Sequence, residues 1–159
     1  MYYRQIVYFF LLIQLSGCAY NYQDIDWKNP PKPNTNNYFY ICADGFCDQN
    51  AQIAKSYAIS TDVLYQIIQD VIMKQPRTEL VKQDTHNKTM VIVQRTPWLK
   101  FPDVIQIQVI STESEQASYL WYSKAVYGYY DFEVNKKRLL DWQTLVDQEV
   151  QIYLNTNLK

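Results

Sequence analysis

The thiol of Cys18 is the side chain whose sequence context most clearly indicates a chemical reaction. It follows Leu15-Ser16-Gly17, and an apolar run from Ile6 to Ile13 precedes that triplet after a single cation, Arg4. A charged segment, a short apolar segment and small residues before a cleavage point are typical of a secretory signal peptide. A cysteine directly after the cleavage point offers a thiol for acylation. We therefore expect residues 1–17 to be a lipoprotein signal peptide and Cys18 to be the lipidated first residue of the mature chain.

Two other interpretations of Cys18 remain open: an ordinary signal peptide with an incidental cysteine, or a buried N-terminal strand rich in Tyr and Phe. The apolar run is too short to span a bilayer, so we predict a membrane anchor made of acyl chains such as palmitate. Ala19 follows the cysteine, where aspartate would favour the inner membrane in Gram-negative lipoproteins. We expect an outer-membrane protein whose domain faces the periplasm, with the inner membrane or the cell surface as alternatives.

Cys42 and Cys47 could form a disulfide, a redox pair or part of a metal site. The dipeptide Asp44-Gly45 between them favours a turn, and an extracytoplasmic compartment favours oxidation. A redox motif is usually more tightly spaced, and zinc would need two further ligands in a chain with one histidine. We predict a structural disulfide, no metal and no other cofactor.

Asp103 and Asp131 are the two carboxylates that could form an acid–base pair, as in a carboxylate-dependent hydrolase or isomerase. The structural alternative is that Asp131 caps a helix and that Asn135, one turn later, ties the preceding loop to it. We favour this alternative and expect no catalytic residue. His86 is alone in a polar turn, and the chain contains no glycine-rich phosphate loop or dinucleotide fingerprint.

Two aromatic segments are candidates for contact with a partner. One is the loop Pro97-Trp98-Leu99-Lys100-Phe101-Pro102, and the other is the tyrosine-rich stretch 127–132. We hypothesise that they flank one end of a cleft between a sheet and a helix. The candidate ligand or partner contacts are Trp98, Phe101, Tyr127, Tyr129, Tyr130, Asp131, Asn135 and Arg138. The alternatives are ordinary packing for the aromatic side chains, and a surface cation or a salt bridge for Arg138.

Composition limits the remaining function classes. Cleavage after residue 17 leaves about 140 residues, enough for one domain. The net charge of the chain is −1, and its basic residues form no cluster, so we expect no nucleic-acid partner. Fifteen tyrosines and three glycines predict many amphipathic rings, which suit a core and an apolar ligand equally.

The expected elements follow from hydrophobic periodicity. Residues 18–37, rich in Pro and Asn, are expected to form a flexible tether reaching up to roughly 60 Å, or less if Trp27 docks on the domain. The folded domain is expected at 38–159. Strands are predicted at residues 53–60, 79–83, 88–95, 103–111 and 117–126. One helix is predicted between Ser60 or Thr61 and Pro76, and a second helix after Asp131, with an apolar stripe through Leu139, Trp142, Val146, Val150 and Tyr153.

This order predicts an α+β fold in which a five-stranded antiparallel sheet carries both helices on one face, in the order β-α-β-β-β-β-α. The connectivity resembles the TBP-like or helix-grip class. That class contains DNA-binding modules and modules that close an apolar cavity, so it does not select a function.

Two stretches resemble the family of domain of unknown function 1499 (DUF1499), found in bacteria and plastids. The likeness covers roughly residues 38–150. The first landmark is the cysteine pair. The second is a strand-to-helix segment whose matching positions are Ser123, Gly128, Asp131, Asn135, Lys136 and Arg138. Between these two stretches, Phe101-Pro102-Asp103 resembles a shorter middle element of the family. This chain has Ala125-Val126 where the family usually shows an arginine, and Glu133 where it shows a glycine.

The resemblance implies a fold and an envelope location, because the family has no established general activity. We expect a non-enzymatic envelope lipoprotein that binds a protein partner or a small apolar or lipid-like ligand, with the membrane contacted through Cys18. The alternatives are the carboxylate-dependent enzyme and a purely structural envelope protein.

Overall fold

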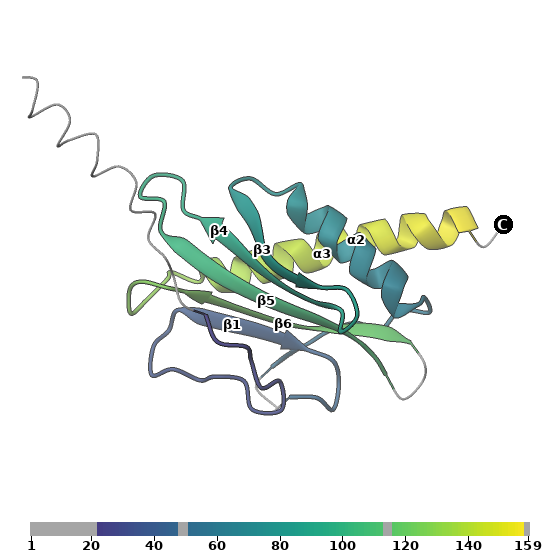
Figure 1. Ribbon diagram of the computed structural model, residues 1–159, viewed down its shortest axis with the longest axis horizontal. Coiled ribbons are helices and arrows are strands. Elements are labelled where there is room, and N and C mark those ends of the chain that lie inside the picture. Colours follow the sequence, from purple (N-terminus) through teal and green to yellow (C-terminus); the bar gives the residue numbers. More distant parts are fainter. Residues whose placement is uncertain (1–21, 48–50, 113–115, 158–159) are drawn as a thin grey trace, which may run out of the picture.

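The computed structural model describes residues 22–47, 51–112 and 116–157, so Cys18 and the predicted signal peptide lie outside the described residues. The elements are β1 (Tyr38–Cys42), β2 (Gln52–Ile53), α2 (Thr61–Met73), β3 (Thr78–Asp84), β4 (Thr89–Arg95), β5 (Pro102–Ser111), β6 (Ala117–Ala125) and α3 (Val134–Asn157). The described part of the chain is an α+β domain with one sheet and two helices (Figure 1). None of its helices is long and apolar enough to cross a bilayer.

The sheet is mixed and has six strands in the described residues, in the order β2-β1-β6-β5-β4-β3. Its edge pair, β1 and β2, is parallel. All other neighbouring strands are antiparallel. The prediction of five antiparallel strands is therefore correct for most of the sheet and wrong at one edge.

The predicted strand at residues 53–60 is the element that differs. Only Gln52–Ile53 pairs as a strand there, and Tyr57 forms an isolated bridge with Ala117. Burial does not alternate in this segment, because Ala54 and Tyr57, three residues apart, are buried and the two residues between them are exposed. The strand that sequence analysis missed is β1. Its sequence Tyr-Phe-Tyr-Ile-Cys shows no polar alternation, as expected for a strand covered on both faces.

Both helices begin where local sequence signals predict, and α2 also ends where predicted. Ser60 caps α2, because its Oγ accepts a hydrogen bond from the Val63 N–H at 3.2 Å. The helix ends before Pro76, since proline lacks the N–H that helix continuation requires. In α3, the predicted stripe is buried against the sheet from Leu139 to Val150, while Tyr153 is only partly buried.

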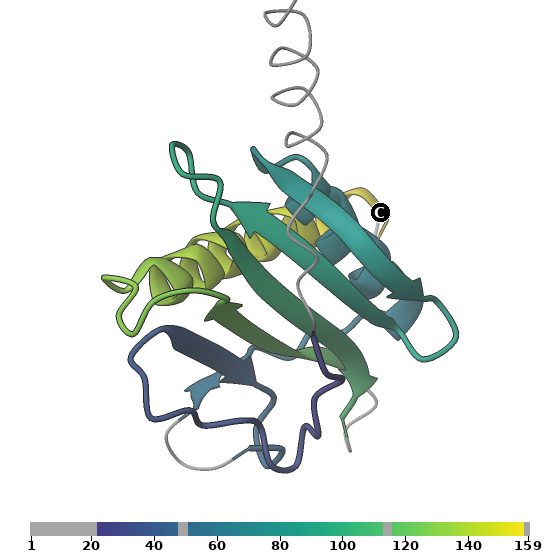
Figure 2. The ribbon, with the colours of Figure 1, turned by 60° about the vertical axis from the view of Figure 1, so that its left-hand side comes forward.

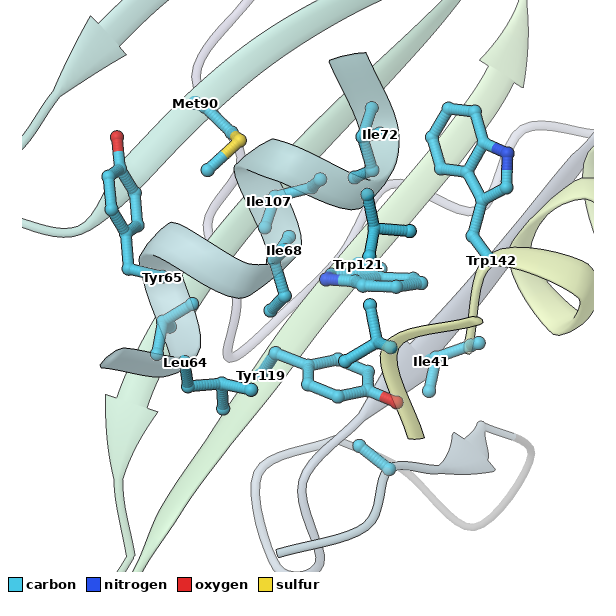
Figure 3. Packing of buried hydrophobic residues seen from close by; sticks show 14 of the residues in the cluster. Ile41, Leu64, Tyr65, Ile68, Ile72, Met90, Ile107, Tyr119, Trp121 and Trp142 are labelled. Atoms are coloured by element: carbon cyan, nitrogen blue, oxygen red, sulfur yellow. The ribbon is translucent and has the colours of Figure 1, made fainter. Parts of the chain in front are cut away.

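The main core fills the space between the helices and one face of the sheet (Figure 3). Trp121 on β6 lies at its centre, fully buried, with its ring stacked on Tyr119 at a centroid distance of 4.4 Å. Leu64, Ile68 and Ile72 of α2 pack on the same cluster. The interlayer space holds large side chains where a helix-grip cavity would require a hollow.

The other face of the sheet is covered by residues 22–37, which sequence analysis assigned to the tether. Residues 22–37 run along the side of the sheet away from the helices (Figure 2). Ile25 and Trp27 pack there against Tyr40, Leu120 and Tyr122. The Gln106 side chain also donates to the Gln23 carbonyl at 2.8 Å. The described part of the predicted tether is thus docked on the domain, as anticipated for the case in which Trp27 docks, because the strand positions that face away from the helices are also apolar. The remaining residues of that stretch, 18–21, lie outside the described residues.

The Cys42–Cys47 disulfide is present, as predicted, with the two Cα atoms 5.9 Å apart. Cys42 is the last residue of β1 and is fully buried. Gly45 adopts a φ of 79° in the turn between the cysteines, a conformation that favours glycine. The bridge closes the turn that connects β1 toward the edge strand β2.

Candidate binding surface

Two loops lie at the same end of the sheet, which we call the aromatic end: residues 96–101, between β4 and β5, and residues 126–133, between β6 and α3 (Figure 2). The rings of Phe101 and Tyr127 contact edge to face, with centroids 5.8 Å apart. The Val126 N–H donates to the Pro102 carbonyl at 3.1 Å. The bases of the two loops are therefore in contact, as the hypothesis that they flank one end of a cleft requires.

Large apolar side chains at the aromatic end point into solvent. Trp98 is 91% exposed, Leu99 70%, Phe132 82% and Tyr129 69%. Tyr130 is half exposed and contacts Phe132 edge to face at 5.1 Å. Several exposed large apolar side chains gathered at one end of a domain indicate a surface that contacts another molecule.

The backbone holds these side chains in place. Thr96 accepts the Phe101 N–H on its Oγ1 at 2.9 Å and donates its own N–H to the Phe101 carbonyl, which closes the first loop. In the second loop, Phe132 and Glu133 have φ values of 55° and 62°. Such left-handed residues cost about 1–2 kcal/mol each when they carry a Cβ. The surrounding contacts therefore outweigh a local backbone strain at Phe132 and Glu133.

Asp131 supplies part of this stabilisation. Its Oδ1 accepts the Glu133 N–H at 3.1 Å, and its Oδ2 accepts both the Asn135 N–H and the Asn135 side-chain amide, at 2.9 and 2.6 Å. Asp131 thus caps the start of α3, as the structural alternative predicted, and Asn135 ties the loop to the helix.

A buried polar cluster lies directly beneath the loops, and Arg138 is its centre. Arg138 donates to four side chains: Nη2 forms an ion pair with Asp103, Nη1 donates to Ser123 and Asn135 at 3.0 and 2.7 Å, and Nε donates to Gln94 at 2.6 Å. Ser123 Oγ also donates to Asn135. The Arg138 and Asp103 side chains are each 6% exposed.

The cluster joins the ends of four strands to α3. Gln94, Asp103 and Ser123 occupy core-facing positions of β4, β5 and β6, in the rows that continue inward as Ile92, Ile105 and Trp121. Asn37, just before β1, accepts from the Asn135 amide on its carbonyl at 3.0 Å. Its own side chain donates to the Gly128 carbonyl.

Burial raises the pKa of the Asp103 carboxyl, and the adjacent Arg138 guanidinium acts in the opposite direction by favouring the carboxylate. Both groups are engaged by protein partners. The cluster therefore closes this end of the core and occupies the place where the predicted cleft would lie.

Several residues predicted to contact a ligand or partner therefore have another role. Asn135 is fully buried and Arg138 is 8% exposed, so they support the loops from below and are not part of the exposed surface. The surface-cation alternative for Arg138 is wrong, and the salt-bridge alternative is correct. His86 lies in the exposed turn after β3, where its N–H binds Asp84 at 3.0 Å. The described residues contain no group of His, Cys, Asp and Glu side chains suited to a metal ion.

Comparison with known families places these features in a defined domain. A family model described as "Protein of unknown function (DUF1499)" matches residues 25–145, which is most of the chain. The chain belongs to the DUF1499 family. No curated protein matches it.

The DUF1499 match begins at Ile25, within the segment that covers the second face of the sheet, and ends within α3. The docked N-terminal segment is therefore part of the family domain. The match also includes both aromatic loops and every member of the Arg138 cluster. The backbone at position 133 explains why the resemblance implies a glycine there. Glycine adopts a φ of 62° without strain, whereas this DUF1499 member has Glu133 at that position.

Sequence analysis missed Asn37 and Gln94 as members of the cluster. A signal was present, because Gln94 and Asp103 are polar residues at positions that continue buried apolar rows of their strands. A polar residue in such a row is expected to have a buried partner. Which partner it has depends on how α3 crosses the sheet.

Proposed function

We propose that this DUF1499 protein is an envelope lipoprotein, anchored in the outer membrane through acylated Cys18, whose periplasmic domain binds an apolar partner without catalysis. The observation that carries the binding part is the aromatic end, where Trp98, Leu99 and Phe132 are largely exposed on loops held by the sheet. The anchoring part rests on the Leu15-Ser16-Gly17-Cys18 sequence.

The exposed side chains support a binding surface, because a domain gains stability when it buries large apolar side chains and this domain leaves them exposed. Burial of a large apolar side chain contributes about 1.5–3 kcal/mol. The backbone at Phe132 is strained, with a φ of 55°, and its ring is nevertheless left 82% exposed. A contact with a second molecule would recover that burial.

The enzyme alternative is less well supported by the same geometry. Asp103 is buried and ion-paired with Arg138, while Asp131 holds the first turn of α3. An acid–base pair needs carboxyl groups that a substrate can reach. Each of these carboxylates has a structural partner that substrate binding would have to displace.

Lipidation is tested by expressing the full chain in a Gram-negative bacterium that is fed labelled palmitate. We expect label in the wild-type protein and none in Cys18→Ser, and we expect the mature N-terminus to be Cys18 by mass spectrometry. Ala19→Asp should shift the protein from outer-membrane to inner-membrane fractions. Label that persists in Cys18→Ser would contradict the proposed anchor.

Binding is tested in the same cells with a photo-crosslinking residue in place of Trp98. The matched control carries the residue in place of Ile152, which is 57% exposed near the C-terminal end of α3. We expect crosslinks to a protein or lipid from position 98 and none above background from position 152. Equal yields from the two positions would show that the aromatic end is not a specific contact surface.

A further inference from the structure

We propose that the partner of the aromatic end is the lipid bilayer itself, so that the domain lies on the membrane with residues 96–101 and 126–133 in its interface. This inference rests on the proposed function, because it takes Cys18 to be the anchor. It replaces the expected picture of a domain held away from the membrane by a tether.

The chain between the anchor at Cys18 and the domain is too short to hold the domain far from the membrane. Tyr22 packs against Val93 and Val104, on the sheet face away from the helices and near the aromatic end. Only Ala19, Tyr20 and Asn21 separate it from Cys18. Even a fully extended chain covers at most about 14 Å over this stretch, at 3.3–3.6 Å per residue. An acylated Cys18 therefore keeps Tyr22, and the aromatic end beside it, close to the lipid surface.

The exposed side chains of the aromatic end are of the types that suit a membrane interface. Trp and Tyr are enriched at membrane interfaces, because their rings are apolar and their N–H or O–H groups bind water and headgroups. The aromatic end presents Trp98, Tyr129 and Tyr130 together with the purely apolar Leu99 and Phe132. This mixture fits a shallow position at the boundary between headgroups and acyl chains.

Positively charged side chains also lie at the aromatic end. Arg77, Arg95 and Lys100 lie together beside the first loop: the Arg77 Nε donates to the Arg95 carbonyl at 3.0 Å, and the Arg95 Nη1 donates to the Lys100 carbonyl at 3.4 Å. Lipid phosphates attract such cations. On the second loop, Glu133 is paired with Lys136 at 3.0 Å, so its charge is partly compensated.

The opposite end of the sheet argues for one defined orientation. Its turns contain Asp84, Thr85, His86 and Asn87 after β3, and Thr112 and Gln116 between β5 and β6. Such polar turns would be costly to place in a bilayer. The domain thus has one end suited to lipid and one end suited to water.

Trp98 is also the probe that tests the inference. Trp121 and Trp142 are buried and Trp27 is half-buried, so Trp98 is the tryptophan most accessible to an external quencher. The acylated mature protein is reconstituted into vesicles of phosphatidylethanolamine and phosphatidylglycerol. One set of vesicles contains a lipid with a doxyl quencher near the headgroup. We expect a blue shift of Trp98 emission, quenching by this lipid and a several-fold loss of quenching by aqueous acrylamide.

Two variants serve as controls. Trp98→Phe gives the emission of the three remaining tryptophans, which is subtracted from the wild-type signal. Trp98→Phe combined with Ile152→Trp places an exposed tryptophan at the other end of the molecule. In this variant, we expect no lipid quenching and full access for acrylamide. Circular dichroism checks that both variants are folded.

The outcomes separate this inference from the proposed function. If the protein is acylated and bound to vesicles but Trp98 remains open to acrylamide, the bilayer contact is wrong and the lipid anchor stands. Equal lipid quenching at positions 98 and 152 would also overturn the orientation. If Cys18 carries no acyl chain and the protein does not sediment with vesicles, the proposed function fails and this inference fails with it.

Discussion

The two ends of the sheet are built from the same strands but are finished in opposite ways. At the aromatic end, the connecting loops expose Trp98, Leu99 and Phe132, and a buried ion pair lies beneath them. At the opposite end of the sheet, which we call the polar end, the turn after β3 is a short hydrogen-bonded loop. Asp84 there accepts hydrogen bonds from the N–H groups of His86 and Asn87, each at 3.0 Å. Ordinary turn chemistry suffices to connect these strands. The aromatic loops therefore do more than connectivity requires.

The helix α3 fastens both ends, again with different means. Asn135 and Arg138 hold the aromatic end through a largely buried network. At the polar end, Asp147 forms an ion pair with the exposed Lys55 and accepts a hydrogen bond from Tyr57. This contrast indicates that the aromatic end needs a rigid base, whereas the polar end tolerates a partly solvated contact.

The largest expected effect is the loss of the Arg138 cluster. Arg138→Ala leaves the Asp103 carboxylate buried without its cation, and it removes partners from Gln94 and Ser123. Removal of one member of a buried ion pair typically destabilises a protein by about 3–5 kcal/mol. Urea unfolding measures this loss. Lys137→Ala, at the neighbouring exposed position, should change stability by less than about 0.5 kcal/mol. Equal effects of the two variants would show that the cluster does not hold the aromatic end.

High pH is expected to act on the buried tyrosines near the polar end. Burial raises the pKa of Tyr119, and it also raises the pKa of Tyr57, which binds Asp147. The unfolded chain then releases these protons first, so stability is complete below pH 10 and falls as the pH rises above it. The loss for Tyr119 alone is about 1.4 kcal/mol per pH unit. Absorbance at 295 nm and circular dichroism should change together. Ionisation of all tyrosines before unfolding would contradict this expectation.

A smaller effect is expected when α3 is released at the polar end. Asp147→Ala removes the ion pair with Lys55 and the acceptor of the Tyr57 hydroxyl. Because Lys55 is largely exposed, most of the loss comes from the hydrogen bond, about 1–2 kcal/mol. Thermal or urea unfolding provides the measurement, with Asp141→Ala on the same helix as the control. A loss as large as that of Arg138→Ala would remove the proposed difference between the two ends.

The strained turn at the aromatic end should be improved by Glu133→Gly. Glycine adopts a φ of 62° without strain, while the lost Lys136 pair is exposed and weak. After the entropy of glycine in the unfolded chain is counted, we expect a gain of about 0.5–1 kcal/mol. Glu133→Ala loses the same ion pair but keeps the strain, so it should show no gain. A gain of equal size in Glu133→Ala would show that charge, and not backbone conformation, is responsible.

The smallest expected effect on stability is that of Trp98→Ala, within about 0.5 kcal/mol, because the ring is 91% exposed. The same variant should lose binding at the aromatic end, measured as vesicle association of the protein without its acyl chain. Trp98→Ala should therefore lower binding without lowering stability, whereas Arg138→Ala should lower both. A large stability loss in Trp98→Ala would indicate that the loop packs on the domain in solution.

Much of the fold could be predicted from local patterns. The Ser60 cap, Pro76 and the apolar stripe of α3 define the helices, and the Asp84–Asn87 turn defines the hairpin of β3 and β4. These features depend on neighbours within a few residues. The edge of the sheet was predicted incorrectly, because β1 and residues 53–60 differ in pairing partners rather than in composition.

The sequence by itself determined the cysteine pair, the two helices, the family and the apolar character of the loops at 96–101 and 126–133. Only the tertiary structure decided that these loops meet, that residues 22–37 cover the second sheet face, and that Arg138 lies among Gln94, Asp103 and Ser123. The physical reason is distance along the chain. Arg138 reaches a carboxylate 35 residues away because the register of β4, β5 and β6 brings their ends under the first turns of α3.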